Sequence, residues 1–128
     1  MTPKLVLATA LALSLTAPQA ALADHGGDGG GDVRVSGTCG RGATSNLRLR
    51  SKDGGIRVRF EVEHIRFSGT WRVTIVREGR VAYRGRERAR RSFEIERRVS
   101  DYSGADHVSV RAVGPHGLTC AASATLSG

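Results

Sequence analysis

The stretch Ile56-Arg57-Val58-Arg59-Phe60-Glu61-Val62-Glu63 decides the fold, because apolar and charged residues alternate along its whole length. Side chains of a β-strand point alternately to opposite faces, so the four apolar residues share one face and the four charged residues share the other. The stretch therefore predicts a strand with one dry and one wet face, as is typical of antiparallel sheets.

The same period of two recurs along the rest of the chain. Trp71, Val73 and Ile75 alternate with Arg72 and Thr74, and no segment of a dozen residues carries a helical stripe. Further short apolar segments lie at 33–35, 47–49, 81–83, 93–95, 108–112 and 118–126. Turn residues separate the segments at 52–55, 68–69, 78–79 and 114–117, with 78–79 predicted as a hairpin turn. The pattern predicts an all-β protein, an antiparallel β-sandwich of seven or eight strands.

Residues 1–23 read as a signal peptide. Lys4 precedes an apolar run at 5–15, which matches the ~7–15 residues of a signal core and is shorter than the ~20 of a membrane-spanning helix. Ala21-Leu22-Ala23 supplies the small-x-small pattern for cleavage after Ala23. We expect a secreted, extracellular protein with no transmembrane anchor in its mature form.

The mature chain begins with a leader at 24–32 that is almost entirely Gly and Asp, with one His. Such a composition predicts a flexible tether, and its carboxylates leave cation binding open as an alternative. Residues 33–128 are enough for a single domain and no more.

Cys39 and Cys120 are the only cysteines, and an even count in an exported chain predicts one disulfide. Cys39 has the parity of Val33 and Val35, and Cys120 has the parity of the apolar positions around it, so both sulfurs can face inward. Closing a loop of 81 residues predicts a stabilisation of roughly 4–5 kcal/mol.

The segments around Cys39 and Cys120, with 47–50, 56–63, 69–73 and 101–106, carry a resemblance in layout. The chain resembles immunoglobulin and fibronectin type III-like sandwiches, in particular small secreted actinobacterial proteins of uncharacterised function. The resemblance implies a fold and an extracellular location, and it attaches no activity.

Few residues suggest catalysis or metal binding. The histidines are His25, His64, His107 and His116, and none of their spacings suggests a metal pair. The loop between Asp101 and Asp106 offers two carboxylates to a calcium ion, although such residues more often make turn hydrogen bonds. We expect no enzyme activity and no cofactor.

The strongest signal is charge. The net charge of +8 includes Lys4, so the mature chain carries +7, and all but one of its basic residues are Arg. A coding sequence rich in G and C is an alternative explanation for the use of Arg in place of Lys. The stretch 77–98 alone holds nine Arg against four Glu, and its segment 86–91 lacks apolar residues apart from Ala89, which predicts an exposed loop. Guanidinium groups bind phosphate, sulfate and carboxylate bidentately, so the candidate anion-binding residues are Arg84, Arg86, Arg88, Arg90, Arg91, Arg97 and Arg98.

These features predict a non-catalytic secreted binding or structural module that contacts anionic polymers or the cell envelope. No specific nucleic acid is expected, because the chain has few aromatic residues to stack on bases. A small inhibitor or ligand carrier, acting through a loop or a cavity of the sandwich, is the alternative.

Overall fold

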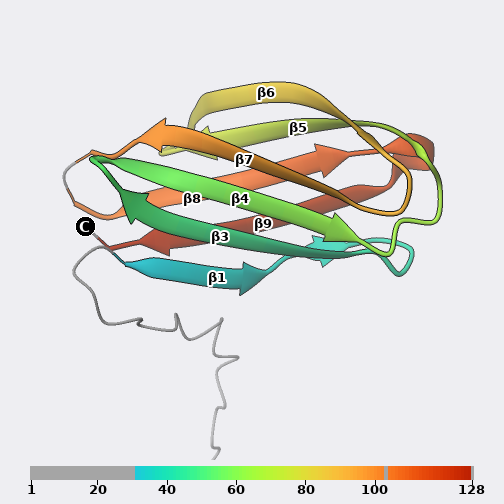
Figure 1. The fold of residues 1–128 in the computed structure, drawn as a ribbon, viewed down its shortest axis with the longest axis horizontal. Coiled ribbons are helices and arrows are strands. Elements are labelled where there is room, and N and C mark those ends of the chain that lie inside the picture. The colour runs from blue at the N-terminus through green and yellow to red at the C-terminus, as the bar shows by residue number, and fades with distance from the viewer. Residues whose placement is uncertain (1–30, 103, 128) are drawn as a thin grey trace, which may run out of the picture.

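A computed structural model describes residues 31–102 and 104–127 as two antiparallel β-sheets packed face to face (Figure 1). Sheet A has the order β1-β3-β4-β7, and sheet B has the order β2-β9-β8-β5-β6. The strands are β1 (Asp32–Ser36), β2 (Thr38–Cys39), β3 (Thr44–Lys52), β4 (Gly55–Glu63), β5 (Gly69–Arg77), β6 (Arg80–Ala89), β7 (Phe93–Ser100), β8 (Asp106–Val113) and β9 (Thr119–Leu126). The predicted all-β sandwich is confirmed.

The core lies between the two sheets and comes from the alternating apolar positions. Ile56, Val58, Phe60 and Val62 of β4 are fully buried, as the alternation in this stretch predicts. Trp71 of β5 is buried on the facing sheet, and its ring centroid lies 5.3 Å from that of Phe93. Inward-facing residues of both sheets thus form one hydrophobic layer.

All eight predicted strand segments appear, and a further short strand, β2, follows β1 and belongs to the other sheet. The chain changes sheet at Gly37. A Cβ atom there would collide with the Ser45 hydroxyl and lie 2.5 Å from the carbonyl oxygen of Ala121. Only glycine fits so close to both sheets, which explains the ninth strand.

The predicted signal peptide lies outside the described residues, as do residues 24–30 of the predicted leader. Asp32, the last leader residue by sequence, is the first residue of β1. Its carboxylate accepts hydrogen bonds from Nε and Nη2 of Arg48 at 3.0 and 2.6 Å. No helix in the described part of the chain is long and apolar enough to cross a membrane.

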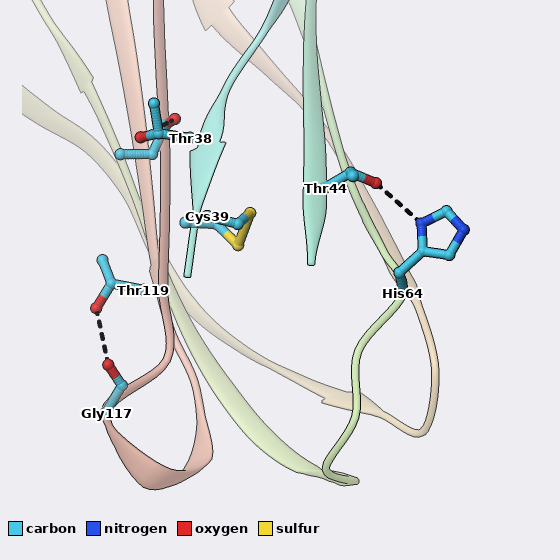
Figure 2. The surroundings of a disulfide bond; sticks show 8 residues. Thr38, Cys39, Thr44, His64, Gly117 and Thr119 are labelled. Atoms are coloured by element: carbon cyan, nitrogen blue, oxygen red, sulfur yellow. Dashed lines mark hydrogen bonds between the residues drawn. A yellow bond between two sulfur atoms is a disulfide. The ribbon is translucent and has the colours of Figure 1, made fainter. Parts of the chain in front are cut away.

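Cys39 and Cys120 form the predicted disulfide, which joins β2 to β9 (Figure 2). The two residues are direct partners in the register of these strands, with their Cα atoms 4.2 Å apart. The bridge therefore lies within sheet B and fixes the short strand β2 to its only neighbour.

The predicted exposed loop at 86–91 is wrong for residues 86–89. Residues 86–89 belong to β6, and only 90–92 connect β6 to β7. β6 is an edge strand that pairs with β5 alone, at one margin of the sandwich. A strand at the margin of a sheet buries few side chains, and Ala89 is the only buried residue of β6. The sequence of β6 therefore lacks the apolar alternation of an interior strand.

Candidate anion-binding face

The strand β6 places three of the candidate arginines, Arg84, Arg86 and Arg88, at alternate positions and therefore on one face. Arg86 lies directly opposite Arg72 of β5, and Arg84 lies directly opposite Thr74. Directly opposite residues of an antiparallel pair point to the same face. Since the core residues of β5 occupy the other parity, these arginines point outward from sheet B.

Arg111 of β8 lies on the same face as Arg72, Arg84, Arg86 and Arg88, on the other side of β5. Thr74 is the register partner of Arg111 on β8 as well as of Arg84 on β6. We call the exposed residues Arg72, Arg84, Arg86, Arg88 and Arg111 the arginine face.

No acidic side chain accompanies these five arginines on the sheet. The only acidic residues of β5, β6, β8 and β9 are Glu87, whose register partner is the core residue Trp71, and Asp106, which is buried. Within residues 31–102 and 104–127, no member of the arginine face forms an ion pair. The positive charge on this side of the sandwich is therefore uncompensated.

The outer side of sheet A is different, because its arginines lie beside carboxylates. Arg57 pairs with Glu96 at 2.9 Å, and Arg59 pairs with Glu94 at 2.9 Å. Arg48 holds Asp32 in a two-pronged contact that lowers the pKa of that carboxyl group. The two sheets thus divide the charge: sheet A mixes both signs and sheet B displays one.

A structural explanation accounts for only part of this pattern. Charged side chains on an edge strand prevent sheets from joining edge to edge, and that explains the arginines of β6. Arg72 and Arg111 lie on the interior strands β5 and β8, where no edge needs protection. Arg72 also lies directly opposite Arg86, and like charges in that position destabilise a sheet.

The surface between these arginines is hollowed. A shallow depression of about 630 Å³ is lined by Arg72, Val73, Thr74, Arg84, Gly85, Arg86, Arg111 and Val113. A second one, of about 440 Å³, continues across β8 and β9 and is lined mainly by small Ser, Thr and Ala side chains. Hydroxyl groups therefore adjoin the guanidinium groups on this face.

The other four candidates occupy different places. Arg90 and Arg91 are exposed in the connection after β6, where Arg90 borders a hollow of about 610 Å³ together with Arg88. Nη2 of Arg97 donates to the Tyr83 hydroxyl at 3.0 Å, and its guanidinium lies 4.6 Å from the centre of that ring. Arg98 donates to the Asp53 carbonyl group. Arg97 and Arg98 therefore do not join the arginine face.

Sequence reasoning missed Arg72, Arg111 and Thr74. Each sits at a polar position of a strand that the alternation does predict, so the outward orientation was available from the sequence. The proximity of Arg111 to Arg84 was not, because it depends on β5 lying between β6 and β8.

The loop with two carboxylates contains a buried ion pair. Nη1 of Arg77 lies 3.7 Å from Oδ1 of Asp106, and both side chains are buried. The guanidinium carbon of Arg77 also lies 3.5 Å from the centre of the Tyr102 ring. Burial raises the pKa of Asp106, and a hydrogen bond with Asp101 raises it further. A buried guanidinium beside Asp106 disfavours a cation at the same place.

The described histidines make local contacts. Nδ1 of His64 lies 3.2 Å from the Thr44 hydroxyl, as Figure 2 shows, and Nδ1 of His107 lies 3.0 Å from the Thr125 hydroxyl. His116 packs on Phe67, with ring centroids 4.6 Å apart. In the part of the chain that the structure covers, no three His, Cys, Asp or Glu side chains gather to hold a metal ion.

No family model, curated protein or solved structure matches this chain.

Proposed function

We propose that this protein is a secreted, non-catalytic module that binds anionic polymers, such as those of a cell envelope, through the arginine face. The supporting observation is the segregation of charge: five exposed arginines on sheet B have no acidic neighbour on the same face. The ligand would meet the surface of a sheet rather than the exposed loop expected from the sequence.

The chemistry of arginine fits this role. Each guanidinium is always charged and presents donors in a planar fork that matches two oxygens of a phosphate, sulfate or carboxylate group. On β6 the three outward arginines repeat at about 6.8 Å, twice the rise per residue of an antiparallel strand. A linear polymer can therefore contact several of them at once, and each contact displaces counterions.

Binding to a polyanion such as polyphosphate or heparin tests the proposal. The variant R72T/R86T/R111T removes three charges from the arginine face while keeping a residue type that favours strands. Its matched control is R34T/R50T/R66T, which removes three exposed charges from sheet A and a loop. Both variants have the same net charge, so a difference between them reports the location of binding.

We expect the arginine-face variant to bind more weakly and with a flatter salt dependence. Each lost ion contact should reduce the slope of log affinity against log salt by roughly 0.7–0.9. The control variant should retain most of the parent slope. Equal losses in the two variants would mean that the protein binds through its overall charge, and the arginine face would have no special role.

A further inference from the structure

Building on this proposed function, we infer that Thr74 and the four arginines around it form a discrete subsite for a tetrahedral oxyanion, the phosphate or sulfate group of a polymer. Arg72, Arg84, Arg86 and Arg111 are these four. The inference names the chemical group that the arginine face recognises.

The sheet register centres the subsite on Thr74. Arg84 and Arg111 are its direct partners on either side, so their Cβ atoms lie about 5 Å from that of Thr74. Arg72 is the next outward residue along β5, about 6.8 Å away, and Arg86 is the diagonal neighbour at about 7–8 Å. Arginine side chains are long enough to converge over Thr74 from all four positions.

The surface at this point has the shape of a site. Thr74 is half-buried, whereas the four arginines are exposed, and all five residues line the depression. Val73 and Gly85 also line the depression, although their position in the strands points away from it, so they contribute backbone to its floor. The volume of about 630 Å³ lies within the range of ordinary ligand sites.

The number of donors favours phosphate or sulfate over carboxylate. A carboxylate carries one charge on two oxygens, and a single guanidinium fork can satisfy both of them. Four guanidinium groups and a hydroxyl offer far more donors than that. A sulfate ester or a terminal phosphate presents three acceptor oxygens around one atom, one more than a carboxylate, which suits several guanidinium groups at once.

The decisive variant is Thr74→Val, because it removes the hydroxyl and keeps the shape, the strand preference and every charge. Thr70→Val is its matched control: Thr70 also faces outward on β5, opposite Arg88, and lies outside the depression. Affinities of the full mature protein are measured by calorimetry at one salt concentration for polyphosphate, heparin and polyglutamate. Circular dichroism checks that each variant is folded.

We expect Thr74→Val to lose roughly tenfold in affinity for polyphosphate, heparin or both, the effect of losing one hydrogen bond to a charged group. Its affinity for polyglutamate should be unchanged, as should every affinity of Thr70→Val. A loss restricted to polyphosphate assigns the subsite to phosphate, and a loss restricted to heparin assigns it to sulfate.

Parent-like affinity of Thr74→Val for both polyphosphate and heparin would overturn the subsite. So would an equal loss for polyglutamate, because a carboxylate polymer should not need the hydroxyl. The wider proposal fails on a different result: R72T/R86T/R111T binding all three polymers as well as R34T/R50T/R66T. The two ideas are therefore tested separately.

Discussion

Replacing Arg72 by Thr should make the fold more stable while it weakens polyanion binding. Arg72 lies directly opposite Arg86 on the outer side of sheet B, with no carboxylate on that face to offset the repulsion. Coulomb's law in water gives about 0.8 kcal/mol for two like charges about 5 Å apart, before salt screening. Cross-strand pairs contribute roughly 0.2–1 kcal/mol, so we expect a gain in unfolding free energy of about 0.5 kcal/mol at low salt.

Urea denaturation at low and high salt measures this gain. At 1 M salt the Debye length falls to about 3 Å, so most of the stabilisation should disappear. Arg59→Thr is the control, since Arg59 also faces outward from an interior strand but pairs with Glu94 at 2.9 Å. That substitution breaks an exposed ion pair and should lower stability slightly instead of raising it. If Arg72→Thr instead destabilises the protein at low salt, the like-charge pair is not a source of strain and this reasoning is refuted.

Three further predictions concern stability. Removing the disulfide with C39A/C120A should lower the free energy of unfolding by about 4.5 kcal/mol, because the bridge closes a loop of 81 residues in the unfolded chain. A denaturation midpoint equal to that of the parent would contradict this prediction. Gly114→Ala should cost about 1–3 kcal/mol by the same measurement, because its Cβ would collide with the Trp71 ring; unchanged stability would show that the ring moves freely. Burial raises the pKa of Asp106 above 3.8, so the folded state holds that proton more tightly than the unfolded state does. The stability that Asp106 contributes is fully present below its unfolded pKa and is lost as pH rises through the raised pKa of the folded state. Asp106→Asn should remove this loss of stability with rising pH. A variant whose stability depends on pH as the parent's does would contradict the prediction.

Much of the fold could be predicted because the governing signal is local. Alternation of apolar and charged residues marks β4 and β5 within a few residues of sequence, and a single pair of cysteines leaves only one disulfide to form. The change of sheet at Gly37, which makes β2 a separate strand, could not be predicted in this way. It depends on how closely Ser45 and Ala121, both distant in sequence, approach that glycine.

The candidate site was predicted only in part for the same physical reason. Arg84, Arg86 and Arg88 were found by charge density, although Arg86 and Arg88 were assigned to a loop because an edge strand buries so little. Arg111 became part of the site through the pairing of β5 with β8, which joins segments more than thirty residues apart. Arg97 lies close in sequence to the cluster, yet its parity turns it toward Tyr83 and away from the arginine face.

The most direct test of the account is a map of the surface that a bound polyanion covers. Backbone amide shifts of the isotope-labelled protein, followed by nuclear magnetic resonance during titration with short polyphosphate, give that map residue by residue. We predict that the largest changes fall on β5, β6 and β8, centred on Thr74, and that β1, β3 and β4 on the opposite side stay unchanged. Changes centred on sheet A, or spread evenly over both sheets, would contradict the assignment of binding to the arginine face.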